Sequence, residues 1–267
     1  MQKTVLITGV SSGIGAATAK ALAEGGYRVF GGARNPDKVR PVPGIELVAM
    51  DVCNDAQVRE AVAHVFQKAG RIDIVINNAG VSLVGPVEAA SDSEAQALFD
   101  TNLFGALRVM RAVLPVMRAQ RASLIVNVSS VLGFLPAPFM GLYASSKFAL
   151  EGLSESLDHE VRGFGVRVML VEPNFTSTSL DTNAWQSKEH IPAYTGAFLD
   201  TVDAVKKQVA GGTAPAAVAA RIVAAIEGKY QMRHPADRGA KLLSILRRFA
   251  PAAPVDKGIR KTFGLKA

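Results

Sequence analysis

The sequence predicts an α/β protein in which helices cover both faces of a parallel, doubly wound sheet of about seven strands. Short apolar runs without polar alternation, typical of buried parallel strands, alternate with longer stretches that fit helices. In addition, a glycine-rich segment at residues 8–15 follows the first apolar run directly, as it does where a strand turns sharply into a helix.

The elements can be placed in chain order from these patterns. We expect strands at residues 4–8, 27–33, 45–50, 72–77, 124–128 and 166–171, and helices at residues 15–24, 55–69, 93–117, 143–162 and 215–227. Gly25 and Gly70 end the first two helices, since helices commonly stop at glycine. Asn35-Pro36 opens a turn after the second strand, and Pro115 falls near the end of the third helix.

The alternation loosens after Pro173. Residues 174–213 mix aromatic, polar and charged side chains without a clear strand, which predicts a loop with short helices that covers a site as a lid. No linker rich in Gly, Pro or Ser divides the chain, so we expect residues 1–267 to form a single domain.

Composition and targeting signals narrow the class of protein. Of the 267 residues, 49% are hydrophobic and 20% are charged, which allows a large core. No apolar run is long enough to span a bilayer, and Met1 leads into the first strand without a signal peptide, which favours a cytoplasmic protein. The single Cys53 excludes an internal disulfide, and we expect a buried thiol and no metal site.

Basic residues are concentrated at the C-terminal end. Residues 229–267 carry ten Lys and Arg against two Asp, a net charge of +8, whereas residues 1–228 carry a net charge of −1. We expect this tail to be an amphipathic helix with a solvated basic face rather than a site for a specific anionic partner. The tail lacks interleaved aromatic residues and a recognition motif, so nucleic-acid binding is not expected.

The segment Thr8-Gly-Val-Ser-Ser-Gly-Ile-Gly15 has the context of a dinucleotide-binding turn, although its glycine spacing differs from the usual one. Glycines let the backbone approach a pyrophosphate, and the helix N-terminus offers N–H groups and a partial positive charge. We expect the cofactor to contact Gly9, Ser11, Ser12, Gly13, Ile14 and Gly15.

The end of the second strand indicates which nicotinamide cofactor binds. A site that prefers NAD(H) usually has a carboxylate there, which bonds the ribose 2′-hydroxyl. Here Ala33 is followed by Arg34, whose guanidinium can bind a 2′-phosphate with paired donors. The sequence therefore favours NADP(H) over NAD(H), with a solvent-exposed loop arginine as the alternative interpretation.

Tyr143 and Lys147 share one face of the helix predicted at residues 143–162. A free phenol, with a pKa of about 10, exchanges protons poorly near neutral pH, and a nearby ammonium lowers that pKa by stabilising phenolate. Ser130 can hold the oxygen that gains or loses the proton. These side chains suggest carbonyl reduction or alcohol oxidation, whereas the Tyr-x-x-x-Lys spacing alone is a weak signal.

From about Lys3 to Thr178 the chain resembles the short-chain dehydrogenase/reductase family, whose members have a Rossmann-type fold. The motifs that carry the resemblance are the glycine turn at residues 8–15, Asp51-Val52, Asn77-Asn78-Ala79-Gly80, Asn102, Ser130 and Tyr143-x-x-x-Lys147. The resemblance implies that Tyr143 is the general acid in reduction and the general base in oxidation. It also implies that Lys147 lowers the pKa of Tyr143 and binds the nicotinamide ribose, that Ser130 polarises the carbonyl, and that Asn102 supports a water-linked proton relay.

Further cofactor contacts follow from the same resemblance. Asp51 would bind the adenine amino group and Val52 would add a backbone contact, with a helix cap as the alternative role of Asp51. The family commonly has Pro-Gly after the sixth strand, whereas Glu172-Pro173-Asn174 has Asn there; Asn tolerates positive φ, so we expect the turn to be kept. Thr178, or alternatively Thr176, would bind the carboxamide. The remaining expected contacts are Asn78, Ala79, Gly80 and Pro173.

Three stretches look similar to 17β-hydroxysteroid and retinol dehydrogenases, namely residues 34–36, 99–105 and 156–160. This similarity favours an apolar alcohol or ketone, which would be steroid-, retinoid- or lipid-like, or a xenobiotic. The apolar side chains expected to line its pocket, or alternatively to pack in the core, are Phe134, Leu135, Phe139, Trp185, Tyr194 and Phe198. The alternative functions are those of an enzyme similar to 3-oxoacyl reductases and of a non-catalytic NADP-binding regulatory protein.

The resemblance also predicts a homodimer or homotetramer that assembles through the helices near residues 93–117 and 146–162. In the tail, residues 241–249 read Lys-Leu-Leu-Ser-Ile-Leu-Arg-Arg-Phe, a mixture of apolar side chains and cations that suits an interfacial helix. Peripheral membrane contact is therefore a further hypothesis, with a subunit contact as its alternative.

Overall fold

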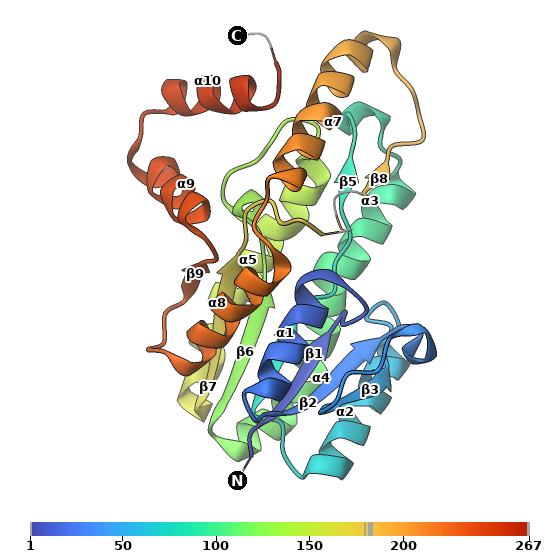
Figure 1. The fold of residues 1–267 in the computed structure, drawn as a ribbon, viewed down its shortest axis with the longest axis vertical. Coiled ribbons are helices and arrows are strands. Elements are labelled where there is room, and N and C mark those ends of the chain that lie inside the picture. The colour runs from blue at the N-terminus through green and yellow to red at the C-terminus, as the bar shows by residue number, and fades with distance from the viewer. Residues whose placement is uncertain (1, 179, 181–183, 266–267) are drawn as a thin grey trace.

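The computed structural model describes residues 2–178, 180 and 184–265. A parallel seven-stranded sheet runs through the molecule in the order β3-β2-β1-β4-β6-β7-β9 (Figure 1), which confirms the predicted fold class. Its strands are β1 (Thr4–Thr8), β2 (Arg28–Ala33), β3 (Ile45–Ala49), β4 (Ile74–Asn77), β6 (Ser123–Val128), β7 (Val166–Glu172) and β9 (Arg233–Pro235).

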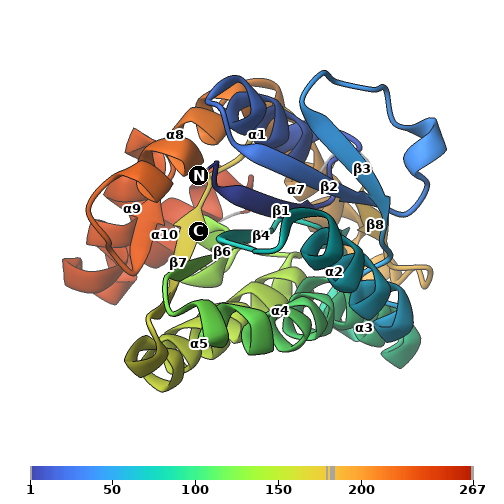
Figure 2. The same ribbon diagram turned by 90° about the horizontal axis from the view of Figure 1, so that it is seen from below.

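Helices cover both faces of the sheet (Figure 2). They are α1 (Gly13–Glu24) and α8 (Pro215–Glu227) on one face, and α2 (Asp55–Ala69), α4 (Ala106–Gln120) and α5 (Gly141–Val161) on the other. Neighbouring residues of β1 point to opposite faces of the sheet. Leu6 belongs to the apolar core under α2, α4 and α5, and Ile7 belongs to the core under α1 and α8. Both faces of the central strands are therefore buried, as their continuous apolar sequence predicts.

The remaining elements lie around the carboxyl ends of the strands or connect the main ones. They are the two-stranded ladder of β5 (Leu83–Val84) and β8 (Trp185–Gln186), helices α3 (Asp92–Phe99), α7 (Thr195–Ala210), α9 (Arg238–Phe249) and α10 (Ala252–Thr262), and short helical turns η1 (Pro36–Lys38), η2 (Val87–Ala89), η3 (Asp100–Gly105), η4 (Val131–Gly133), η5 (Arg162–Phe164) and η6 (Pro192–Tyr194).

Local signals explain why α2 has the bounds that the sequence predicts. The Asn54 side chain accepts a hydrogen bond from the backbone N–H of Gln57, 3.1 Å away, and so caps the first turn of the helix. Gly70 ends the helix in the left-handed conformation, with φ 71°. Both signals are local, so the sequence alone could place both ends of α2.

The helix expected at residues 93–117 is interrupted by a different winding. It consists of α3, the π-helical turn η3 and α4, joined without a break from Asp92 to Gln120. A π turn inserts an extra residue into the helical winding and frequently marks a functional site. The apolar periodicity on either side did not reveal this insertion.

The C-terminal third differs most from expectation. Within the predicted lid at residues 174–213, where we expected short helices and no strand, β8 pairs with β5 and α7 is 16 residues long. Within the predicted helical tail, Arg233–Pro235 forms β9, which pairs with β7 as the seventh strand of the sheet. The tail is thus part of the sheet and not only a solvated helix.

Candidate active site

The carboxyl ends of β1 and β4 meet where the strand order reverses direction, which is where doubly wound sheets bind ligands. Thr8, the last residue of β1, ties these ends together, because its Oγ1 accepts hydrogen bonds from the backbone N–H groups of Asn78 and Ala79, each at 3.0 Å. Asn78 Nδ2 donates in turn to the carbonyl oxygen of Gly9, at 3.1 Å. The glycine turn is thereby fixed against the segment after β4; the sequence singled out Asn78 and Ala79 but gave Thr8 no such role.

The backbone of the turn requires its glycines. Gly9 and Gly13 have φ of 74° and 60°, in the left-handed region, and a Cβ on Gly15 would lie 2.2 Å from the Gly9 carbonyl oxygen. The first turn of α1 holds no acidic residue that would neutralise the partial positive charge of the helix N-terminus. Of the predicted contacts, Gly9, Ser11, Ser12, Gly13 and Ile14 line the cleft above this turn, whereas Gly15 is buried behind it.

The cleft has a volume of about 630 Å³ and extends over the ends of β2 and β3. Arg34, Asp51 and Val52, which the sequence predicts to contact the cofactor, line this part, and Arg34 is exposed. The Asp51 side chain accepts a hydrogen bond from the backbone N–H of Cys53 at 3.0 Å and does not cap α2, which Asn54 does. The Cys53 thiol is exposed at the cleft, so the prediction that it is buried is wrong.

One wall of the cleft is built by the first turns of α5 and the end of β6. Tyr143 and Lys147 are 5% and 6% exposed and line the cleft together with Ser130. Lys147 Nζ donates a hydrogen bond to the carbonyl oxygen of Val128 at 3.0 Å and lies 5.8 Å from the centroid of the Tyr143 ring. Ser130 Oγ accepts a hydrogen bond from the backbone N–H of Leu132 at 3.1 Å. Three of the four side chains that the sequence predicts to be catalytic therefore meet at one wall.

Asn102 lies within the π turn η3 and is 2% exposed. Its Oδ1 accepts from the backbone N–H of Val81, and its Nδ2 donates to the Val81 carbonyl at 2.9 Å and to Ser146 Oγ at 3.0 Å. The side chain therefore joins the segment after β4 to the catalytic helix α5. It does not line the cleft itself, and its place in a proton relay stays a prediction.

The segment after β7 closes the cleft on the side of the lid. Pro173, Thr176 and Thr178 line it, which leaves both threonines as candidates for the carboxamide contact. Thr176 is 4% exposed and its hydroxyl donates to the carbonyl oxygen of Asn174 at 3.0 Å. Among the described residues, only Arg121 and Phe139 are non-glycine residues with positive φ, so the turn is formed at Asn174 without the positive φ that Asn tolerates.

The apolar wall differs from the predicted one. It is formed by Val131, Leu132, Met140, Phe175, Leu180 and Trp185. Of the side chains expected to line it, only Trp185 does so, and Phe134, Leu135, Phe139, Tyr194 and Phe198 do not. The Phe139 ring instead lies 5.7 Å from the Phe198 ring and 6.2 Å from the Tyr194 ring. The alternative of core packing holds for Phe134, Phe139 and Phe198, which pack against a buried apolar cluster, and for Leu135, which is buried.

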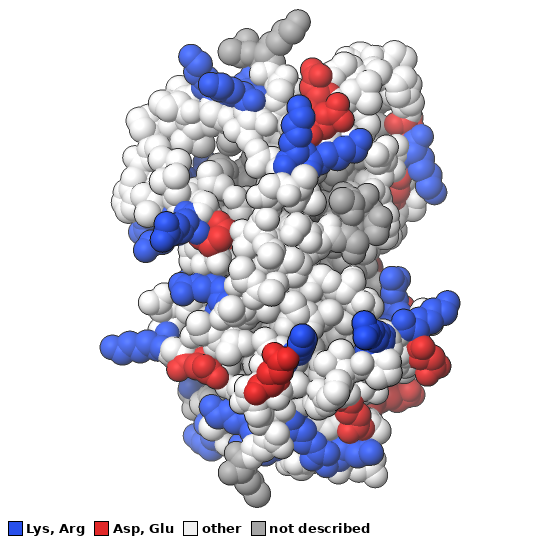
Figure 3. Space-filling view, viewed as in Figure 1, with Lys and Arg blue, Asp and Glu red and all other residues white. Residues whose placement is uncertain are grey.

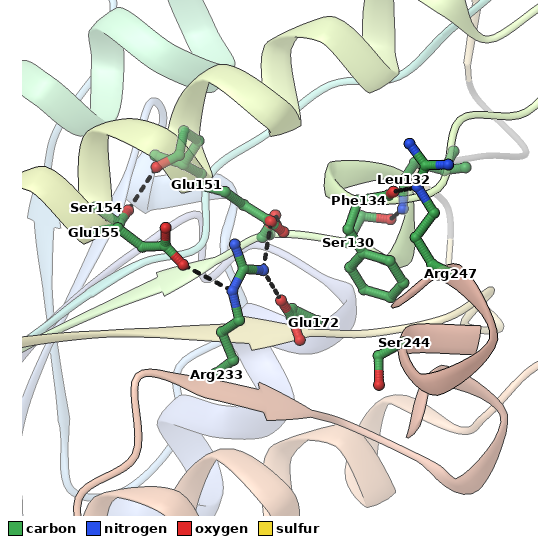
Figure 4. Close-up of polar contacts among 12 residues, drawn as sticks. Ser130, Leu132, Phe134, Glu151, Ser154, Glu155, Glu172, Arg233, Ser244 and Arg247 are labelled. Carbon is green, nitrogen blue, oxygen red and sulfur yellow. Dashed lines mark hydrogen bonds and ion pairs between the residues drawn. The ribbon is translucent and has the colours of Figure 1, made fainter. Parts of the chain in front are cut away.

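A cluster of three carboxylates and one cation lies behind the catalytic wall (Figure 4). Arg233 of β9 binds Glu172 at the end of β7, Glu151 of α5 at 2.6 Å and Glu155 of α5 at 2.8 Å. Ser129, next to Ser130, donates to Glu151 at 2.8 Å. We call these four charged residues the Arg233 cluster. The sequence did not predict it, because Arg233 stands 82 residues from Glu151.

The pKa values in the Arg233 cluster reflect its excess of negative charge. Burial and the neighbouring carboxylate of Glu151 raise the pKa of Glu172 to about 7, although the Arg233 cation lowers it. Burial also raises the pKa of Glu151. Within the described residues, one oxygen of Glu172 is buried without a hydrogen-bond partner, which agrees with a carboxyl group that is partly protonated near neutral pH.

Two further predictions concern metals and membranes. No group of His, Cys, Asp and Glu side chains that could hold a metal ion occurs among the residues that the structure describes. None of the helices in the described ranges is long and apolar enough to cross a bilayer. A cytoplasmic location stays a prediction.

The doubly wound sheet, the glycine turn at its switch point and the cleft above that turn define a dinucleotide-binding class of protein. The sequence model of the family described as short chain dehydrogenase matches residues 3–189. A 3-ketodihydrosphingosine reductase from Bacteroides thetaiotaomicron is 37% identical over 220 residues, which are 82% of this chain and 81% of that protein. Human retinol dehydrogenase 8 is 39% identical over 191 residues, which are 67% of this chain and 60% of that protein.

Solved structures agree with this relationship. A short-chain dehydrogenase from Streptomyces avermitilis has a TM-score of 0.83 at 31% identity, with 99% of this chain and 98% of that chain covered. A Burkholderia phymatum short-chain dehydrogenase/reductase in complex with NAD has a TM-score of 0.81 at 27% identity over 92% of this chain and 93% of that chain. A Burkholderia cenocepacia short-chain dehydrogenase in complex with NADP has a TM-score of 0.77 at 25% identity over 98% and 99%.

The chain belongs to the short-chain dehydrogenase/reductase family. It is an oxidoreductase that acts on a carbonyl or alcohol group with a nicotinamide cofactor. One structural neighbour binds NADP and another binds NAD. These neighbours support a nicotinamide dinucleotide as the cofactor without distinguishing NADP(H) from NAD(H).

Proposed function

We propose that the protein interconverts a carbonyl and an alcohol with NADP(H), using Tyr143 as the proton donor in reduction and the proton acceptor in oxidation. The observation that carries this proposal is a single cleft whose lining includes Tyr143, Lys147 and Ser130 together with the glycine turn and Arg34. The proton-transfer residues and the nucleotide-binding residues can therefore act on a substrate and a cofactor bound in the same cleft.

The residues of the cleft fit a dinucleotide. A Cβ on Gly9 would lie 2.9 Å from Cα of Ala79, and one on Gly80 would lie 3.3 Å from Asn102 Oδ1, so both positions leave little room for a side chain. The glycine turn would hold the pyrophosphate, Arg34 the 2′-phosphate and Lys147 the nicotinamide ribose. Asp51 would bind the adenine amino group, and Thr176 or Thr178 would bind the carboxamide.

The chemistry divides between cofactor and protein. The nicotinamide supplies or accepts the hydride at the substrate carbon. In reduction Tyr143 Oη donates a proton to the substrate oxygen, and Ser130 Oγ donates a hydrogen bond to the same oxygen as it gains negative charge. The ammonium of Lys147, held at 3.0 Å from the Val128 carbonyl, favours the phenolate that remains. Oxidation follows the reverse path, with Tyr143 accepting the proton.

An apolar, lipid-like substrate is favoured over a small polar one. Five of the six side chains on the wall beyond the catalytic residues are aliphatic or phenylalanine, and the sixth is Trp185. The 3-ketodihydrosphingosine reductase and the retinol dehydrogenase that resemble this chain are both named for lipid substrates. Long-chain ketones, steroids and retinoids therefore belong in the first panel of substrates, with small polar ketones as the contrast.

Replacement of Tyr143 by Phe tests the mechanism. We expect Y143F to lower kcat for ketone reduction at least about 100-fold, because the variant lacks the proton donor, while NADPH binding measured by fluorescence is kept. Y194F is the matched control, since the Tyr194 hydroxyl binds Glu88 outside the cleft. If Y143F kept full activity, or if neither protein oxidised NADPH with any substrate of the panel, the non-catalytic alternative would be favoured.

Replacement of Arg34 by Ala tests the cofactor preference. R34A is expected to raise KM for NADPH about tenfold or more and to leave KM for NADH unchanged, because only NADPH carries the 2′-phosphate. R40A is the control, since Arg40 is an exposed arginine that does not line the cleft. Comparable kcat/KM for NADH and NADPH in the unmodified enzyme would contradict the proposed role of Arg34.

We also propose a homodimer or homotetramer that assembles through the outer faces of η3, α4 and α5. Phe104 and Phe148 are 46% and 40% exposed on these elements, which suits a surface that a second copy covers. Analytical ultracentrifugation of the purified protein would decide, since a monomer at micromolar concentration excludes this assembly.

A further inference from the structure

Helix α9 carries an apolar face that points into solvent. Leu242, Ile245, Leu246 and Phe249 are 56%, 47%, 39% and 74% exposed. Their spacing of three, four and seven residues places them on one face of the helix. A surface helix usually turns such a face toward the protein core, and here it is turned away from it.

The opposite face of α9 is held by the protein. Ala240 is fully buried, and Leu243 packs against the apolar cluster that contains Met140 and Tyr143. Arg247 Nε donates a hydrogen bond to the carbonyl oxygen of Phe134 at 3.1 Å (Figure 4). These contacts fix the rotation of the helix, so the apolar face cannot turn inward without breaking them.

Cations border the exposed face. Lys241 and Arg248 lie along its edge, and the Arg248 guanidinium is 5.7 Å from the centroid of the Phe249 ring. Helix α9 has no acidic residue after its N-cap Asp237, and Lys257 of α10 adds another exposed cation. In Figure 3 the surface over α9 and α10, at the upper left, is largely white, with blue Lys and Arg side chains above and below it and a red acidic side chain beside the lower ones.

We propose that this face of α9 docks on an anionic lipid bilayer, with its apolar side chains among the headgroups and its cations on the lipid phosphates. Helices of this kind lie in the plane of a membrane interface, bound by apolar area and by attraction to anionic lipids. A second copy of the chain is the less favourable partner, because a two-fold contact between α9 helices would bring identical cations together. The net charge of +8 at residues 229–267, against −1 for the rest, agrees with this choice.

Docking in this way would place the substrate entrance near the bilayer. Helix α9 contacts η4, whose residues Val131 and Leu132 form part of the apolar wall of the cleft. If the substrate is apolar, which rests on the proposed function, it can pass between membrane and cleft over a short path. Binding to vesicles is independent of turnover and can be measured separately.

Co-sedimentation with vesicles tests the proposal on the full-length protein. We expect the protein to sediment with vesicles of phosphatidylcholine and phosphatidylglycerol at low salt and to stay in the supernatant with phosphatidylcholine alone. The double variant I245S/F249S is expected to lower the bound-to-free ratio at least about tenfold, and so is K241Q/R248Q, because each cation near an anionic surface contributes about 1 kcal/mol. Added salt should weaken binding of the unmodified protein.

Matched variants on α7 serve as controls. L199S removes a leucine that is 56% exposed, and K206Q/K207Q removes two exposed lysines, so both should bind vesicles as the unmodified protein does. All variants should keep the melting temperature and the turnover of a water-soluble ketone, which separates lost docking from misfolding or from a failed enzymatic proposal. Absence of vesicle binding by the unmodified protein overturns the proposal, as does a loss of subunit association in I245S/F249S without any vesicle binding.

Discussion

Helix α5 contributes carboxylates to two clusters of acidic residues and arginines, and these clusters differ in their ratio of cations to carboxylates. Near its end, Asp158 binds Arg162 at 2.6 Å and Arg167 at 2.9 Å and accepts a further hydrogen bond from the backbone N–H of Val168. In the middle, the Arg233 cluster sets three carboxylates against one cation. Asp158 and Glu172 are equally inaccessible, at 2% and 1% exposed.

Their pKa values nevertheless move in opposite directions. Burial raises the pKa of Asp158, but hydrogen bonds from Arg167 and Val168 outweigh it and bring the pKa to about 2. Burial and the charge of Glu151 bring the pKa of Glu172 to about 7. The ratio of cations to carboxylates, and not burial alone, therefore decides whether the buried acids Asp158 and Glu172 are ionised.

The largest expected effect comes from removing the single cation of the Arg233 cluster. R233M should lower the free energy of unfolding by about 3–5 kcal/mol, because it leaves buried carboxylates without a partner. Urea denaturation at pH 8 measures this difference. The exposed pair of Arg59 and Asp55 gives the control variant R59M, which should change stability by less than about 1 kcal/mol. Equal losses of unfolding free energy in R233M and R59M would contradict the idea that the buried carboxylates depend on Arg233.

The second effect is a dependence on pH that E172Q should remove. The folded protein holds a proton on Glu172 up to about pH 7, whereas the unfolded chain releases it near the ordinary pKa of 4.5. The unmodified protein should therefore lose up to about 3 kcal/mol of stability as the pH rises from 4.5 through 7. Unfolding free energies measured between pH 5 and 8 should fall less steeply for E172Q. Parallel curves for the two proteins would count against the raised pKa.

The third effect has the opposite sign and lies at lower pH. Asp158 is ionised down to about pH 2 in the folded protein and to its ordinary 3.8 in the unfolded chain, so its contribution is present above about pH 4 and is lost toward pH 2. We expect D158N to be about 2 kcal/mol less stable than the unmodified protein at pH 7. That difference should shrink as the pH of the denaturation experiment is lowered to 3. A difference that stays constant with pH would show that packing, not charge, is responsible.

The smallest effect is expected for Glu155, the exposed member of the Arg233 cluster. Its side chain is 46% exposed, so water screens its bond to Arg233. E155Q should change the free energy of unfolding by less than about 0.5 kcal/mol at pH 8. A larger loss of unfolding free energy would mean that the exposed Glu155 stabilises Arg233 as much as the two buried carboxylates do.

The sequence predicted the elements whose limits are set locally and missed those set by distant contacts. Strand β1 and helices α2 and α8 have the predicted bounds, because caps, glycines and Pro215 mark them. Strand β9 is three residues long and carries no apolar run, so only its pairing with β7 reveals it. The N-terminus of helix α7 has no side-chain cap, so the sequence predicts only a loop with short helices in this region.

The site followed the same rule. Residues directly after β1, β2, β3, β4 and β6 could be assigned to the cleft, since parallel strands bring their carboxyl ends to one edge. The apolar wall could not be assigned, because Met140 lines the cleft while the neighbouring Phe139 packs against Phe198 of the distant helix α7. The role of Arg233 behind Ser129 depends on its contact with Glu151, which is 82 residues away in the sequence.

The π turn η3 fixes the number of residues that the chain must have between α3 and α4. A single-residue deletion between Asp100 and Gly105 would return this stretch to regular winding and rotate Asn102 by roughly 100° relative to α4. Asn102 would then lose Val81 and Ser146, although every side chain of the site was still present in the sequence. In an alignment of relatives, a gap at this position would therefore mark a changed active site even where all of its residues are identical.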